Sequence, residues 1–295
     1  MYGMKKLLTI FFISTIGFCF SQTKEELIRS IISVNRVESN CVGYGCVKSK
    51  QYENFEKLKK KLSDQELVQL SNHRNSTIRI YASKALIQTI PNLTSTLLLN
   101  ELENNKAVKT FDGCIIDVQK TSSIIYHEYW NKIRIEAIRE INGNNYEEDL
   151  AMREKVASDF IMEKLDSIII HSEKEVDWLL YNRAFENRKH KDNYLPRIKK
   201  LAFSKNNAYA FEYLKKHYTS QYTKELENYL KNDFPKAKFQ NENEVFYLHL
   251  FIDILLESKN DSFKQIAIDK LKSEEIWKKH KGWFNATMKK NGIEL

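Results

Sequence analysis

The amino-acid sequence predicts an all-α protein without a β-sheet, and three observations support that class. The first is composition, because the 295 residues include only 8 glycines and 3 prolines. At average usage a chain of this length would carry about three times as many, and sheets need turn residues at intervals of about 8–12 positions. The second is a set of helix-start signals, and the third is a helical spacing of apolar residues that recurs along the chain.

Residues 1–21 have the features of a secretory signal peptide. Lys5 and Lys6 precede an apolar run of about 14 residues, which is too short to span a bilayer comfortably. Cys19 and Ser21 provide small residues at the −3 and −1 positions of a cleavage site. We expect cleavage after Ser21 in preference to lipidation of Cys19, and therefore an exported, periplasmic or secreted protein. The segment resembles the signal peptides of Gram-negative bacteria.

The charge of the mature chain is mildly basic. Residues 1–21 contain two lysines and no acidic residue, so their removal lowers the formal net charge from +8 to +6. Such a charge suits an anionic envelope surface, and an exported protein is not expected to meet nucleic acid. No other segment approaches 18 consecutive apolar residues, so we expect no transmembrane segment in the mature chain.

Helix starts are marked by capping boxes, in which a Ser or Thr oxygen and a Glu or Gln three residues later cover free backbone N–H groups. Four such pairs precede apolar runs: Thr23 and Glu26, Ser63 and Glu66, Ser172 and Glu175, and Ser262 and Gln265. Turn-forming residues separate the helical segments. The pattern predicts about ten helices in one domain, residues 22–295, with 142–145 as the candidate subdivision.

One of these helices, expected at about residues 76–90, carries a continuous apolar stripe. Its members are Ile78, Tyr81, Ala82, Ala85, Leu86 and Ile90. The small alanines allow a neighbouring helix to approach closely. The underlying pattern, apolar–basic–x–x–Ala–x–x–x–Leu/Ile, recurs from Ile133 and from Phe263, and a partial copy runs from Ala210 to Leu214.

The run from Ile78 to Leu86, after its polar turn, resembles the second helix of a HEAT repeat, with residues 63–71 as the first helix. The resemblance is strongest over residues 55–90 and looser over 125–142, 193–217 and 262–273. It implies an irregular right-handed α-solenoid of HEAT-like helical pairs, a fold that usually acts as a scaffold for protein partners.

Three cysteines remain after residue 21. Cys41 and Cys46 enclose a short loop with two glycines, which can bend enough for a disulfide. We favour this pairing over a bridge from either residue to Cys114. No second pair of Cys or His stands at the spacing of a zinc site, so no metal site is predicted.

The sequence contains none of the common catalytic or nucleotide-binding signatures. His127 and Glu128 are adjacent on an expected helix, so their side chains would point about 100° apart and would not face one substrate. Cys114 follows a tight turn near Asp112 and Asp117, but a buried structural cysteine is the more common case. We therefore predict no catalytic residue and no cofactor.

Two basic clusters are the candidate binding sites. The denser one provides the candidate residues Arg188, Lys191, Tyr194, Arg197, Lys199 and Lys200. The other places three lysines between Trp277 and Trp283. Basic residues interleaved with aromatic ones can bind anionic polymers, lipid headgroups or an acidic partner. The competing interpretation, a solvated helix end, is the more frequent one.

Aromatic residues are abundant, with 15 Tyr and 16 Phe. A row between residues 203 and 218 could stack sugars along a groove, although packing between helices is the more common role. Its members are Phe203, Tyr209, Phe211, Tyr213 and Tyr218.

The sequence as a whole favours a non-enzymatic exported scaffold that binds a protein partner through a helical surface. Two alternatives stay open: an envelope hydrolase on a helical scaffold, and a module that binds an anionic glycan or a membrane surface. Fold class does not decide among them, because function resides in sites.

Overall fold

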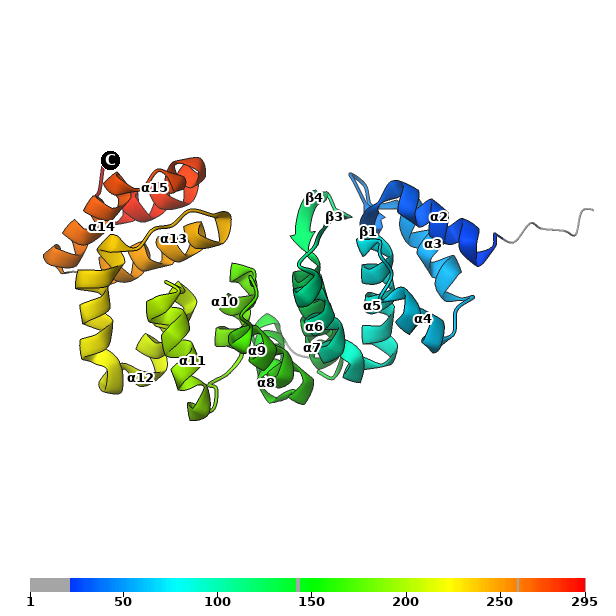
Figure 1. Ribbon diagram of the computed structural model, residues 1–295, viewed down its shortest axis with the longest axis horizontal. Coiled ribbons are helices and arrows are strands. Elements are labelled where there is room, and N and C mark those ends of the chain that lie inside the picture. Colours follow the sequence, from blue (N-terminus) through cyan, green and yellow to red (C-terminus); the bar gives the residue numbers. More distant parts are fainter. Residues whose placement is uncertain (1–21, 142–143, 259, 295) are drawn as a thin grey trace, which may run out of the picture. The chain divides into compact units, whose positions relative to one another are not determined.

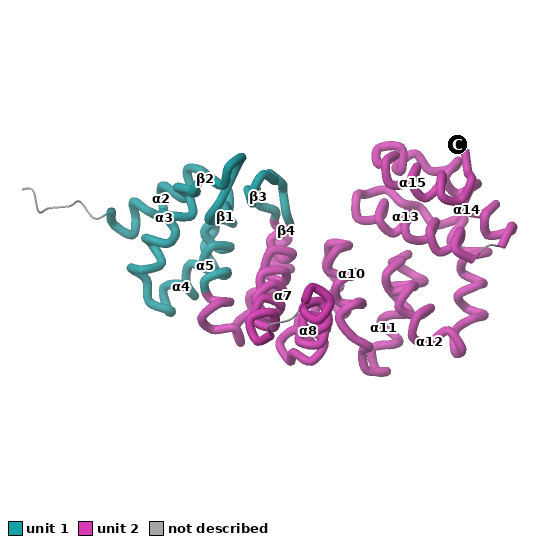
Figure 2. Tube along the Cα trace, turned by 180° about the vertical axis from the view of Figure 1, so that it is seen from behind, with its two compact units in different colours: residues 1–85, 107–119 teal, residues 86–106, 120–295 magenta. Residues whose placement is uncertain are grey.

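The computed structural model describes residues 22–141, 144–258 and 260–294 (Figure 1). The predicted signal peptide and part of the candidate subdivision at 142–145 lie outside the described residues. The chain forms two compact units (Figure 2). Unit 1 comprises the described residues up to Ala85 together with Ala107–Gln119, and unit 2 comprises Leu86–Lys106 and the chain from Lys120 onward.

Unit 1 combines helices with a four-stranded sheet. Its helices are α2 (Lys24–Val34), α3 (Lys50–Lys59), α4 (Asp64–Leu70) and most of α5 (Ser76–Thr89). Its strands are β1 (Arg36–Val42), β2 (Val47–Lys48), β3 (Ala107–Gly113) and β4 (Ile115–Lys120), in the order β2-β1-β3-β4. β1 is antiparallel to β2 and parallel to β3, with Val37 opposite Thr110.

The prediction of an all-α fold without a sheet is therefore wrong, and so is a HEAT-like solenoid built of helical pairs alone. The glycine count misled because this sheet needs few tight turns. Gly43 directly follows β1, and Gly113 is the last residue of β3. Both have a positive φ, a conformation that glycine adopts without steric cost. The parallel pair β1 and β3 is joined by a long, mostly helical connection instead of a turn.

Helix α5 is attached to the sheet by a tyrosine. The hydroxyl of Tyr81 accepts from the backbone N–H of Glu38 in β1 at 2.7 Å and donates to the carbonyl of the same residue at 3.0 Å. The ring stacks on Phe55, with centroids 4.7 Å apart. The predicted stripe members Ile78, Ala82 and Leu86 are fully buried. Arg79, beside that stripe, donates to the carbonyls of the preceding turn.

The loop between β1 and β2 is closed by a disulfide between Cys41 and Cys46. This is the pairing that the short glycine-containing loop favoured. Cys114, the third cysteine of the mature chain, is exposed between β3 and β4.

Unit 2 is helical over its described residues. Its longer helices are α6 (Thr94–Asn104), α7 (Thr121–Arg139), α8 (Asn145–Ser158), α9 (Phe160–His171), α10 (Trp178–Asn187), α12 (Ala208–Asn228), α13 (Glu242–Glu257), α14 (Asp261–Ser273) and α15 (Lys281–Lys290). The short α11 (Leu195–Lys199) continues into a π-helical turn, Lys200–Ser204. Successive helices pack together, as α7 does with α8 and α12 with α13.

Capping residues explain several helix boundaries. The predicted boxes at Thr23 and Ser63 are present. The box predicted from Ser172 is absent, because Ser172 ends α9 and Asp177 caps α10. Asn144 and Asn241 begin α8 and α13 with boxes that the Ser/Thr pattern did not include. An Asn side chain serves as well as Ser at this position.

Candidate binding site

The predicted basic cluster of residues 188–200 lies in unit 2, and its side chains have partners within the protein. Lys191 pairs with Glu163 at 2.7 Å, and Lys199 pairs with Glu225 at 3.0 Å. Arg197 and Lys200 both pair with Glu173, at 2.6 and 3.0 Å. Much of the positive charge that the sequence suggested is therefore balanced inside the molecule.

Tyr194 also contacts other parts of this cluster. Its ring stacks on His190 with centroids 5.5 Å apart and meets the edge of His171 at 4.6 Å. His190 is buried, and its Nε2 lies 2.8 Å from the carbonyl oxygen of Ala184. Burial lowers the pKa of His190 to about 4, so the ring is neutral at physiological pH and adds no charge to the cluster.

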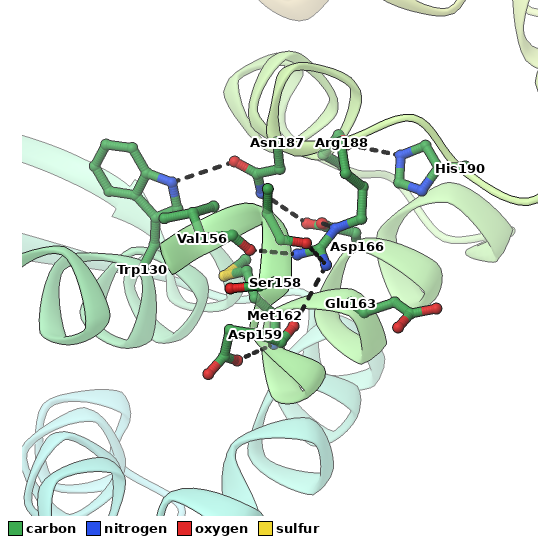
Figure 3. Close-up of polar contacts among 12 residues, drawn as sticks. Trp130, Val156, Ser158, Asp159, Met162, Glu163, Asp166, Asn187, Arg188 and His190 are labelled. Carbon is green, nitrogen blue, oxygen red and sulfur yellow. Dashed lines mark hydrogen bonds and ion pairs between the residues drawn. The ribbon is translucent and has the colours of Figure 1, made fainter. Parts of the chain in front are cut away.

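Arg188, the first of the predicted site residues, is a structural residue at the centre of a buried network (Figure 3). Its Nε donates to Asp166 at 3.0 Å, and its two terminal nitrogens donate to the carbonyls of Val156 and Ala157, each at 2.7 Å. These carbonyls belong to the last turn of α8, where helical partners are missing. One guanidinium thereby caps α8 and neutralises a carboxylate on α9.

Asp166 has no exposed surface and is held by three side chains. Besides Arg188, it accepts from the hydroxyl of Tyr126 at 2.5 Å and from the amide of Asn187 at 3.0 Å. Burial raises the pKa of Asp166 to about 7, because desolvation outweighs the charge of Arg188 and the hydrogen bonds that favour the anion. The network joins α7, α9 and α10.

Asn187 connects this network to a cavity of about 420 Å³ between α7, α8, α10 and α12. Its side-chain oxygen accepts from the indole N–H of Trp130 at 3.4 Å (Figure 3). Trp130, Val156 and Met152 provide the apolar part of the lining. The volume lies within the range of small-ligand sites in proteins.

Two arginines lie over the ring of Trp130. The guanidinium carbon of Arg134, one turn further along α7, is 3.9 Å from the ring centroid, and that of Arg183 on α10 is 4.3 Å away. Each contact contributes about 0.5–2 kcal/mol, depending on how far the cation is removed from water. Burial lowers the pKa of Arg134, and the like charge of Arg183 nearby lowers it further.

The charges lining the cavity are only partly balanced. Arg153 pairs with Asp149 at 2.8 Å, and Arg183 has Glu186 at the longer distance of 3.7 Å. The buried Nε of Arg183 has no hydrogen-bond partner among the described residues. Over the same residues, neither Arg134 nor Lys216 of the lining forms an ion pair. The lining holds four cations and two carboxylates, so the cavity has an excess positive charge that an anionic ligand could balance.

This site was not predictable from the sequence, because its parts are far apart in the chain. Trp130 and Arg134 are four residues apart on α7, whereas Arg183 lies on α10. Arg134 also occupies the basic position of the recurring helical pattern that starts at Ile133, and the pattern gave this position no binding role. The Trp-x-x-x-Arg spacing was the only local signal, since it places a cation beside an aromatic ring on one helical face.

The other residues considered from the sequence have structural surroundings. Burial and Arg183 lower the pKa of His127 to about 4, while Glu128 accepts from Gln88. Asp117 accepts from the backbone N–H of Val118 in β4. No group of three or more potential metal-ligating side chains occurs in the part of the chain that the structure describes.

The aromatic row predicted between residues 203 and 218 is largely core. Phe211, Tyr213 and Tyr218 are buried. Tyr209 is half-buried and stacks on Trp178 at 6.1 Å, and the ring of Phe246 lies 3.7 Å from that of Trp178. These rings cover one another's faces, which leaves less aromatic surface for a sugar.

None of the family models, curated proteins and solved structures compared with this chain matches it. Among the described residues, no helix has both the length and the apolar character needed to cross a membrane.

Proposed function

We propose that this protein is a non-enzymatic binding protein, and that it holds a carboxylate-bearing segment of a protein partner in the cavity beside Trp130. The observation that carries the proposal is a pair of guanidinium groups in the lining: Arg134, which forms no ion pair with the described residues, and Arg183, whose pair with Glu186 is long at 3.7 Å. A planar guanidinium matches a carboxylate with two parallel hydrogen bonds. A bound carboxylate would give Arg134 a partner and reduce the repulsion between the two arginines.

The carboxylates in the lining indicate how much charge the ligand carries. Asp149 and Glu186 both face the cavity, and each already pairs with an arginine. They would repel a ligand with several negative charges, such as a sulfated glycan or a phosphate dianion. A peptide carboxylate carries one charge, and its backbone N–H groups suit these acceptors. This supports a protein partner over an anionic polymer.

The test compares wild type with Arg134→Met and Arg183→Met on an array of random decapeptides that carry carboxylates, either as Asp and Glu side chains or as a free C-terminus. We expect the wild type to bind a subset of these peptides in a salt-sensitive manner, and both variants to lose that subset. Lys200→Met is the matched control, because Lys200 pairs with Glu173 outside the cavity. An unchanged binding pattern in both arginine variants would contradict the proposal.

The alternatives from the sequence predict other ligands, which can be tested with the same variants. Binding to anionic vesicles or to a sulfated polysaccharide that depends on Arg183 would favour a membrane or glycan ligand and would contradict a protein partner.

We also infer that the interaction takes place outside the cytoplasm. This inference depends on the signal-peptide pattern of residues 1–21. Mass spectrometry of the protein purified from its native host should show a chain that begins at Gln22. A full-length chain recovered from the cytoplasmic fraction would contradict it.

A further inference from the structure

We propose that the ligand of the cavity beside Trp130 is the C-terminus of the partner's chain, with its free carboxylate on Arg183 and Arg134 and an apolar last side chain against Trp130. This inference rests on the proposed function, and it specifies which of a protein's carboxylates is recognised. The geometry that carries it is the placement of cationic and apolar lining within one cavity.

The cations and the apolar wall meet at Trp130. The guanidinium carbons of Arg134 and Arg183 lie 3.9 and 4.3 Å from the centre of its ring. Met152 and Val156 line the same cavity from α8. At the end of a polypeptide, the carboxylate and the last side chain are both attached to a single Cα atom. A C-terminal residue can therefore reach the cations and the apolar wall together, whereas the carboxyl group of an internal Asp or Glu brings only its own methylenes.

The size of the cavity agrees with a chain end. A volume of about 420 Å³ lies in the lower part of the range of small-ligand sites, which suits a short chain end. Glu186 and Asp149 can accept the last backbone N–H groups, which a chain end retains.

The orientation of the Trp130 indole is fixed by a hydrogen bond to Asn187, which is itself held by other residues. Asn187 accepts from Trp130 and donates to both Tyr126, at 2.9 Å, and Asp166. The side-chain amide of Asn187 therefore makes its hydrogen bonds to other residues of the protein. The ring is held before a ligand arrives, which lowers the cost of ordering the site on binding.

The experiment uses the full mature chain and three N-acetylated pentapeptides. The first is Gly-Ser-Gly-Ala-Leu with a free C-terminal acid, the second is its C-terminal carboxamide, and the third is the carboxamide Gly-Ser-Gly-Glu-Leu. Binding is measured by calorimetry and by tryptophan fluorescence, with Trp130→Phe identifying the signal from Trp130 among the four tryptophans. We expect the free acid to bind at least about tenfold more tightly than either carboxamide, as the loss of a charged hydrogen bond implies.

Matched variants assign the binding to the cavity. Arg183→Met should weaken the free acid by about tenfold or more, while Lys200→Met should leave its affinity unchanged. Circular dichroism and thermal unfolding should show that Arg183→Met is folded, and Arg183→Lys serves as a second variant that keeps the charge but loses the planar pair of donors.

The outcomes separate the two proposals. If the Glu-containing carboxamide binds as tightly as the free acid, and Arg183→Met abolishes both, the chain-end inference is wrong and the carboxylate-binding function stands. If neither the free acid nor the Glu-containing peptide binds more tightly than the neutral carboxamide, both proposals are wrong.

Discussion

Arg188 donates its Nε–H to the carboxylate of Asp166 across 3.0 Å, in a place where Asp166 has no exposed surface. The same guanidinium covers two carbonyls at the end of α8. Through Asn187, the pair also determines the position of Trp130. Arg188, a candidate binding residue from the sequence, therefore has a structural role and helps to hold the residues that line the cavity.

Replacing Arg188 by Ala should destabilise the protein strongly. The change leaves the buried carboxylate of Asp166 without its cation and removes the donors from the end of α8, so we expect the free energy of unfolding to fall by about 3–5 kcal/mol. Urea denaturation at pH 7.5 measures this. Lys191→Ala is the control, because its pair with Glu163 is exposed and should contribute little to stability. Equal losses in the two variants would contradict a structural role for Arg188.

The buried His190 should make the protein less stable in mild acid. Burial lowers its pKa from 6.5 to about 4, so below pH 6.5 the unfolded chain binds a proton that the folded chain does not. Stability is complete above pH 6.5 and decreases as pH falls toward 4, by roughly 3 kcal/mol from this residue. His190→Gln should flatten the loss, as urea denaturation at pH 7.5, 5.5 and 4.5 can show. A variant profile parallel to that of the wild type would exclude this cause.

The titration of Asp166 should change the stability of the protein in the opposite direction over a similar pH range. Burial raises its pKa from 3.8 to about 7, so the folded chain holds the extra proton and stability decreases as pH rises from about 4 to 7. Asp166→Asn removes this titration. The unfolding free energy of the wild type, relative to that variant, should therefore decline between pH 4.5 and 7.5. If it increases instead, the charge of Arg188 dominates over burial.

The contribution of the hydrogen bonds between Tyr81 and β1 to stability should be measurable by removing the hydroxyl oxygen of Tyr81. Tyr81→Phe leaves the backbone N–H and carbonyl of Glu38 without their buried partner, and we expect a loss of about 1–3 kcal/mol. Tyr146→Phe is the control, since Tyr146 is 76% exposed. Thermal unfolding of both variants is sufficient. A Tyr81→Phe protein as stable as the control would show that this contact contributes little.

Local chemistry was predictable wherever neighbours in the sequence decide the structure. The capping boxes at Thr23 and Ser63, the buried stripe of α5 and the Cys41–Cys46 loop all involve residues within a few positions of one another. The sheet was not predictable in this way. β1 finds its parallel partner β3 about 70 positions along the chain, and no local turn signal announces such a pairing.

The mostly helical character of the chain could be read from the sequence, because capping residues and apolar spacing act within one or two helical turns and the glycine content is low. Which cations are paired with carboxylates and which are not became visible only in the folded chain. The lysines and arginines of 191–200 lie near acidic residues and pair with them. Arg134 and Arg183 meet over Trp130 without enough acceptors. The physical reason is that ion pairing and desolvation depend on distance in space, which the order of residues does not contain.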